Sequence, residues 1–168
     1  MKKVITLLFV LACTISNAQL DTFDFDSYSY DTEEGMKKAE ADALEVSNIL
    51  LSESVKKDRM ARINAGFFLD TWMEKTQNYE FGIYDKYVEI FGYDLDVGVV
   101  ARAAQVKYCI ENKMSSAQGV ESEFGIVKIF IEYATNEDNQ VKQRKAFKKF
   151  QKANDKGKLK ELIENYKS

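Results

Sequence analysis

The stretch Asp58–Glu74, DRMARINAGFFLDTWME, is the longest part of the sequence with the pattern of a buried helix. At about 100° per residue, its apolar side chains point in several directions around the helix axis and do not form one stripe. A helix that is apolar nearly all round is typical of a protein core. Asp58 suits the N-cap position, and Gly66 allows one close approach by a neighbouring helix. The stretch therefore predicts a central helix enclosed by other helices.

Apolar residues at helical spacing recur along the rest of the chain, and the sequence contains no proline to interrupt a helix. Short polar connections between such segments place successive helices antiparallel. The sequence thus predicts an all-α fold, a single compact domain of about five to seven helices arranged as antiparallel helical pairs. Besides 58–74, the expected helices are 32–51, 84–91, a helix from Asp94 or Asp96 to 112, one from Ser116 or Gln118 to 135, 140–153 and 159–166.

The first 18 residues have the pattern of a signal peptide. Two lysines precede a short apolar run, and small residues stand before an expected cleavage point at Gln19. A lipoprotein signal, with lipid attached at Cys13, is the alternative and requires an unusually short apolar run. Either pattern indicates export, so we expect a periplasmic or secreted protein.

Residues 19–33 follow as an acidic, aromatic-rich arm, and residues 34–168 form the helical domain in this division of the chain. The arm has no helical period, so we expect an extended segment whose aromatic side chains pack on the helical body. Calcium binding by Asp24, Asp26 and Asp31 is an alternative, but their spacing lacks the glycine turn and terminal glutamate of an EF-hand loop. No metal site is predicted.

Charge is distributed unevenly along a chain whose net charge is −3. Residues 19–54 carry ten acidic side chains and two lysines, and residues 139–168 carry ten basic side chains and three acidic ones. The basic helices suit an anionic membrane surface; alternatively, they are a solvated face attracted to the acidic segment of the same chain. Their lysines do not alternate with aromatic residues that stack on bases, so no nucleic acid partner is expected.

The sequence contains few residues and motifs that are suited to catalysis. It contains no histidine, which removes Ser-His-Asp and Cys-His catalysis and imidazole zinc sites. Cys109 stands among apolar residues, as a buried and unreactive thiol does. Carboxylates are the remaining general acids or bases, and Asp70 and Glu74, one helical turn apart, are the catalytic candidates. No cofactor is predicted.

Aromatic side chains at the end of the quoted stretch are the candidates for binding: Trp72, Tyr79, Phe81 and Tyr84. Residues 79–83 alternate between apolar and polar or small side chains, and no second extended segment is evident to pair with them. We therefore expect a structured connection at 76–83, where the chain leaves the core. We also expect the functional surface of the protein to lie at this connection.

The order of motifs resembles a loosely defined group of uncharacterised small exported all-helical bacterial proteins. The resemblance rests on Leu50-Leu51, on the run Phe68–Phe81 with its F-L-x-x-W-M-x-x-T-x-x-Y-x-F pattern, and on Gly157-Lys158-Leu159. It covers most of the chain after residue 18. The sequence departs from that pattern at Gln77-Asn78, where a helix-ending proline is expected. The resemblance implies no activity and no catalytic residues.

Three hypotheses of function follow from these patterns. The first is an exported, non-enzymatic helical protein that binds a partner protein or another envelope component. The second is a carboxylate-dependent hydrolase or lyase on a helical scaffold, with Asp70 and Glu74 at its centre. The third is a protein of anionic membrane surfaces that binds through its basic C-terminal helices.

Overall fold

The computed structural model describes residues 19–166, so the predicted signal peptide and Cys13 lie outside the described residues. Within this range the chain is all helical, with no β-strand and with antiparallel helix contacts, which confirms the predicted fold class. It has eight α-helices there, five of them with at least seven residues. The elements are η1 (Leu20–Thr22), α1 (Glu33–Ser52), α2 (Arg59–Lys75), α3 (Ile83–Lys86), α4 (Val88–Phe91), α5 (Leu95–Asn112), α6 (Val120–Thr135), η2 (Glu137–Asn139), α7 (Lys145–Asp155) and α8 (Leu159–Glu164).

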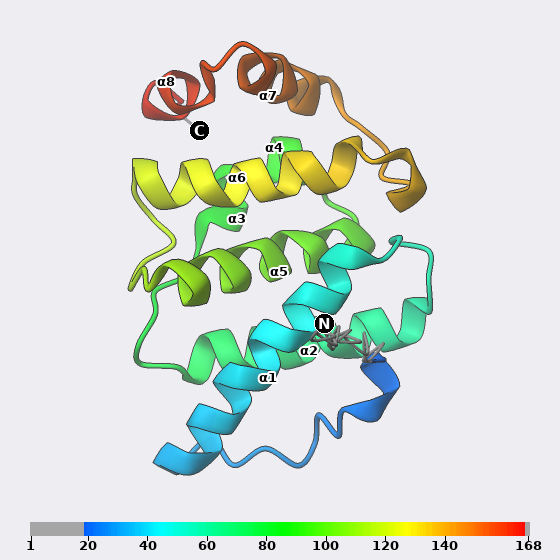
Figure 1. The fold of residues 1–168 in the computed structure, drawn as a ribbon, viewed down its shortest axis with the longest axis vertical. Helices are drawn as coiled ribbons and strands as arrows, with labels where there is room; N and C mark the ends of the chain where they lie inside the picture. The colour runs from blue at the N-terminus through cyan, green and yellow to red at the C-terminus, as the bar shows by residue number, and fades with distance from the viewer. Residues whose placement is uncertain (1–18, 167–168) are drawn as a thin grey trace, which may run out of the picture.

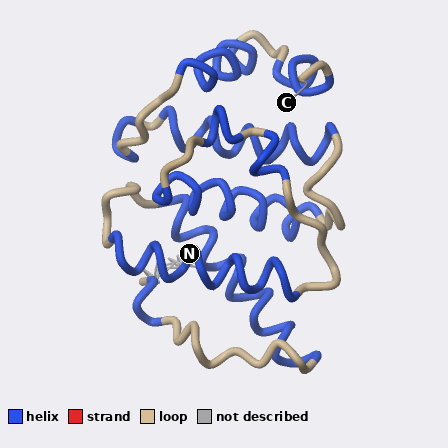
Figure 2. The backbone as a smooth tube through the Cα atoms, turned by 180° about the vertical axis from the view of Figure 1, so that it is seen from behind, coloured by secondary structure: helices blue, strands red, loops and turns tan. Residues whose placement is uncertain are grey.

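The helices are stacked in layers along the longest axis of the molecule, and Figure 1 shows their order. α1 and α2 lie at one end, α5 and α6 cross the middle, and α7 and α8 lie at the other end. Figure 2 shows the same stack from behind, with helices joined by short loops. α5 and α6 are antiparallel. α2 and α5 run in the same direction, as two ion pairs show: Arg59 pairs with Asp96 near the start of both helices, and Asp70 pairs with Arg102 further along both.

α5 is the helix that the others surround, since it contacts α1, α2, α3, α4 and α6. One side of α5, which includes Val99 and Ala103, belongs to the apolar cluster that α1 and α2 form. The other side, which includes Val100 and Ala104, belongs to the cluster with α4, α6, α7 and α8. Small side chains allow close helix packing on both sides, so α5 is the shared wall between two halves of the core.

The helix predicted at 58–74 is present as α2, but the prediction that it is enclosed on all sides is wrong. Met60 is 65% exposed and Phe67 is 59% exposed. α2 lies at one end of the stack, so part of its apolar surface has no helix to cover it (Figure 1). Gly66 does allow the expected close approach, because a Cβ there would lie 2.5 Å from Val99 Cγ2.

Helix starts follow local capping residues. The side chains of Thr32, Asp58 and Asp94 each accept a hydrogen bond from a backbone N–H in the first turn of the helix that follows. Two expected boundaries differ from the structure. Residues 83–91 form two single-turn helices, and the helix expected from residue 140 begins at Lys145. Gln140 itself cannot begin a helix, because its left-handed backbone, with φ 56°, ends η2, and residues 141–144 form a non-helical connection.

The N-terminal arm packs its aromatic side chains on the helical body, as expected. The rings of Phe25 and Tyr28 lie 5.0 Å and 4.8 Å from the ring of Phe68 on α2, measured between centroids. The Tyr28 hydroxyl also donates a 2.7 Å hydrogen bond to Asp42 on α1. The arm therefore covers the face of α2 that carries Phe68, which is 3% exposed.

The connection before α3 has a partner that the sequence did not indicate. The backbone N–H of Glu80 donates to the Ser115 carbonyl at 2.8 Å, and the Ala117 N–H donates to the Glu80 carbonyl at 2.7 Å. These two bonds form one parallel bridge between Glu80 and Ser116. The bridge ties the connection to the α5–α6 loop and so fixes the position of the residues that lead into α3.

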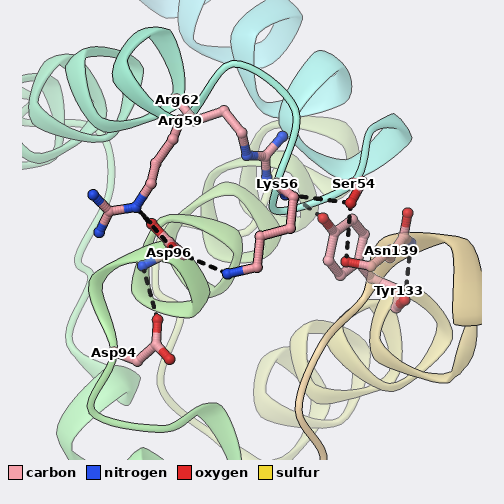
Figure 3. A network of polar contacts seen from close by, with 8 residues as sticks. All are labelled: Ser54, Lys56, Arg59, Arg62, Asp94, Asp96, Tyr133 and Asn139. Atoms are coloured by element: carbon pink, nitrogen blue, oxygen red, sulfur yellow. Dashed lines mark hydrogen bonds and ion pairs between the residues drawn. The ribbon is translucent and has the colours of Figure 1, made fainter.

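A network of polar contacts anchors the loop between α1 and α2 (Figure 3). The Ser54 hydroxyl and the Val55 N–H both donate to the carbonyl of Asn139, at 3.4 Å and 3.2 Å. On the other side of the loop, Arg59 Nε donates to Asp96 Oδ1 at 2.9 Å. The loop is therefore held to η2 and to the first turn of α5.

Arg62 lies behind this loop and is 3% exposed. Its Nη2 donates to the Leu50 carbonyl at 3.0 Å and lies 3.5 Å from the Tyr133 hydroxyl (Figure 3). Its charge is therefore at the C-terminal end of α1, where the helix dipole is negative. Burial lowers the pKa of Arg62. Among the described residues, its Nε and Nη1 atoms have no hydrogen-bond partner.

Candidate functional site

A groove of about 460 Å³ lies between α2, α3 and α5. Four of the six residues that the sequence singled out for catalysis or binding line it: Asp70, Glu74, Phe81 and Tyr84. The other lining residues come from the same elements and from the connection before α3: Met73, Gly82, Asp85, Arg102 and Gln105. The groove is thus where segments distant in sequence bring the predicted residues together.

An ion pair between Asp70 and Arg102 crosses the groove from α2 to α5, with Arg102 Nε in contact with Asp70 Oδ1. The Asp70 side chain is 38% exposed and the Arg102 side chain is 24% exposed. Burial raises the pKa of Asp70, and the charge and hydrogen bond of Arg102 oppose part of that rise. Arg102 also lies over the ring of Tyr84, with 5.7 Å from Cζ to the centroid.

The charges at the groove do not balance. Three carboxylates, Asp70, Glu74 and Asp85, line it together with one guanidinium, that of Arg102. Because Arg102 already contacts Asp70, the exposed carboxylates of Glu74 and Asp85 remain available to a ligand. The groove therefore favours a ligand with positive charge.

The aromatic side chains of the groove are held in place by neighbours. The Tyr84 hydroxyl donates a 2.6 Å hydrogen bond to the Gly92 carbonyl, and burial raises the pKa of Tyr84. The Phe81 ring packs on the ring of Trp72, with centroids 5.7 Å apart. Gln105, which is 1% exposed, accepts a 3.4 Å hydrogen bond from the Gly82 N–H. The apolar side of the groove is thus preformed.

The other two predicted binding residues are not among the residues that line the groove. Trp72 is fully buried beneath Phe81 and contributes to the core. Tyr79 turns towards α1, where its hydroxyl donates to Glu40 at 3.3 Å. Burial raises the pKa of Tyr79 to about 12, with the charge of Glu40 adding to the rise. Both rings support the groove from below through contact with Phe81.

The sequence patterns did not identify three further residues of the groove as site residues: Arg102, Asp85 and Gln105. Arg102 had a detectable signal, because it is the one charged residue between Asp96 and Lys107 in an otherwise apolar helix. A lone charge on a buried helix needs a partner. Its partner is 32 positions away on α2, and no local pattern identifies that pairing.

A second group of charges joins the first turn of α6 to the residues at the junction of α3 and α4, and its carboxylate, that of Glu123, is buried. Glu123, 5% exposed, accepts hydrogen bonds from Lys86 at 2.6 Å, from the Tyr87 hydroxyl and from the Gly119 N–H at 3.2 Å. Burial alone raises the pKa of Glu123, but the hydrogen bonds of Lys86 and Tyr87 outweigh it and hold that pKa below its ordinary value. Lys86 ends α3 and Tyr87 precedes α4, so these hydrogen bonds fix α3 and α4 to the start of α6.

Other chemistry is limited within residues 19–166. Cys109 is a free, fully buried cysteine, and burial raises its pKa to about 11, which agrees with the prediction of an unreactive thiol. In that range no three His, Cys, Asp or Glu side chains are arranged to hold a metal ion. None of the described helices is long and apolar enough to span a bilayer.

Comparison with known proteins adds no relative: the chain matches no protein-family model, no curated protein and no solved structure. The resemblance to small exported helical proteins therefore stays a prediction. Any account of function has to come from the groove and from the surface charge of the chain itself.

Proposed function

We propose that the protein is an exported, non-enzymatic binding module, and that its groove between α2, α3 and α5 takes a lysine or arginine side chain of a partner protein in the cell envelope. The observation that carries this proposal is the combination of three carboxylates and one guanidinium around an aromatic-lined groove. A cationic side chain gains from both parts, since its charge meets the carboxylates and its methylene stem packs on aromatic rings.

The ion pair of Asp70 and Arg102 sets the position of the incoming charge. Arg102 occupies one edge of the Asp70 carboxylate and repels a second cation from the α5 side. Glu74, one turn along α2, and Asp85 on α3 leave the opposite side negative. The bound cation therefore lies between Glu74 and Asp85, next to Phe81.

A titration with a short lysine-rich peptide that contains aromatic residues tests the proposal, with an acidic peptide of equal length beside it. We expect calorimetry to detect binding of the basic peptide alone. The triple variant Asp70→Asn, Glu74→Gln, Asp85→Asn is expected to weaken binding by roughly tenfold or more, because three attractive charges are removed.

Exposed acids elsewhere provide a matched control: Glu33→Gln, Glu132→Gln and Glu164→Gln change the net charge equally and are expected to keep the affinity within about twofold. Equal loss in both variants would contradict a site at the groove.

A second candidate function is hydrolysis or elimination by the carboxylates. The raised pKa of Asp70 favours it, because two neighbouring carboxylates in different environments can divide the roles of acid and base. The contact with Arg102 opposes it, since that contact stabilises the ionised form of Asp70. Asp70→Asn is expected to abolish any such activity across the whole pH range, and an activity that survives in this variant would exclude Asp70 as the catalytic group.

A further inference from the structure

Three lysines of α7 and Lys156, the residue that follows the helix, form one stripe along its exposed side. At 3.6 residues per turn, Lys145, Lys149, Lys152 and Lys156 follow one another at intervals of three or four residues. Each of these four side chains is exposed. The opposite side of α7 carries Phe147 and Phe150, both 1% exposed, which attach the helix to the core. The stripe therefore faces away from the body of the protein.

This arrangement is electrostatically unfavourable for α7 by itself. Like charges at such intervals repel, and the first turn carries Lys145 and Lys148 where the helix dipole is already positive. Within the described part of the chain, none of the lysines of α7 forms an ion pair with a carboxylate. An anion that meets the whole stripe relieves both effects.

The acidic segment of the same chain does not supply that anion. The N-terminal arm and α1 lie at one end of the stack, and α7 and α8 lie at the other, as Figure 1 shows. The expected attraction between the basic helices and the acidic segment of the same chain is therefore wrong, whereas the solvated face itself stays a prediction. The segments at the two ends differ strongly in charge, with a net charge of −8 in residues 19–54 and +6 in residues 139–166.

A groove of about 370 Å³ between α7 and α8 continues the basic stripe. Lys149, Lys152, Lys156 and Lys158 line it together with one carboxylate, Glu161, and with Asn165, and the side chains of Ala153 and Leu162 contribute an apolar lining. Lysine side chains can extend their charges to lipid phosphates while their stems and such a lining meet the acyl boundary.

We propose that the lysine stripe of α7 and the groove between α7 and α8 dock the protein on an anionic phospholipid membrane, with the acidic end directed away from the lipid. The charge asymmetry orients the molecule, because the anionic surface attracts one end and repels the other. A single-stranded nucleic acid fits less well, because Phe147 and Phe150 are buried and present no ring for base stacking. A free phosphate lacks the extended shape that contacts the entire stripe.

Vesicle flotation of the chain from Gln19 to Ser168, which contains all described elements, tests this docking. The probes are vesicles of phosphatidylcholine alone and of phosphatidylcholine mixed with phosphatidylglycerol. We expect binding to the anionic vesicles only, weakened by added salt. The triple variant Lys149→Gln, Lys152→Gln, Lys156→Gln is expected to bind roughly 10- to 100-fold more weakly, and the corresponding arginine variant is expected to retain binding.

The control replaces three exposed lysines from the other layers, Lys37, Lys57 and Lys75, with glutamine and so matches the change in net charge. It is expected to bind as the unchanged protein does. Equal binding to both vesicle types, equal loss in the control, loss in the arginine variant, or displacement by inorganic phosphate or a single-stranded oligonucleotide at low concentration would each overturn the proposal. Because none of the substituted lysines lines the groove at Asp70, failure here leaves the peptide-binding proposal intact.

Discussion

The Asp70 carboxylate and the Arg102 guanidinium are in direct contact across the α2–α5 interface, and both line the groove. Each residue provides the opposite charge that the other needs in a partly buried position. Arg102 is the lone charge in the middle of α5, and Asp70 is a partly buried acid whose pKa burial raises. The pair therefore joins two helices and sets the charge of the candidate site.

Arg102→Gln is expected to raise the pKa of Asp70 further, because the opposing cation is lost while burial remains. A carboxyl whose pKa is higher in the folded state binds more protons when folded. The free energy of unfolding then falls as pH rises from the ordinary carboxyl pKa through the raised one. Urea unfolding across this pH window is expected to show a steeper fall for Arg102→Gln than for the unchanged protein. An unchanged slope would show that Arg102 does not act on Asp70.

Phe67 and Phe68 are a matched pair of neighbours, since one is 59% exposed and the other is 3% exposed under the arm. Phe68→Ala is expected to lower the free energy of unfolding by about 3–5 kcal/mol, because it removes the ring on which Phe25 and Tyr28 pack. Phe67→Ala is expected to cost less than about 1 kcal/mol. Chemical denaturation measures both, and equal effects would contradict the described orientation of α2.

Gly66 on α2 faces Val99 on α5 with no room for a side chain. Gly66→Ala is expected to reduce stability by about 1–3 kcal/mol, because the new methyl group forces the two helices apart. In a Val99→Ala background the same substitution is expected to cost less, which a double-mutant cycle measures. Strict additivity of the two changes would argue against this contact.

The helix layout was predictable from sequence because its determinants are local. Thr32, Asp58 and Asp94 cap their helices through backbone groups within three positions, and apolar spacing marks the helices between them. The enclosure of α2 was not predictable in the same way. A helical wheel shows that Met60 and Phe67 are apolar, but the number of neighbouring helices decides whether they are covered.

The candidate site was predictable only in part, for the same reason. Asp70, Glu74, Phe81 and Tyr84 lie within 15 positions of one another in the chain, so a sequence pattern found them. The groove also needs Arg102 from α5, and its alignment depends on the backbone bridge between Glu80 and Ser116. Such pairings across long sequence separations have no local signature.

Glu123 gives the fold a specific dependence on acid. Its pKa is held below the ordinary value by Lys86 and Tyr87, so its contribution to stability is present above the unfolded-state carboxyl pKa. That contribution is lost as pH falls through the lower, folded-state pKa. Glu123→Gln is expected to lower stability at neutral pH and to flatten the acid side of the stability profile, as thermal unfolding at several pH values measures. A variant with an unchanged acid profile would contradict this account.

The most direct test of the proposed groove is residue-by-residue mapping by NMR during titration with the lysine-rich aromatic peptide. The account predicts that the largest amide shift changes occur at Phe81, Gly82, Arg102 and Gln105, and that the resonances of α7 and α8 stay in place. Shift changes confined to another surface, or no changes at peptide concentrations that saturate the calorimetric signal, would contradict it.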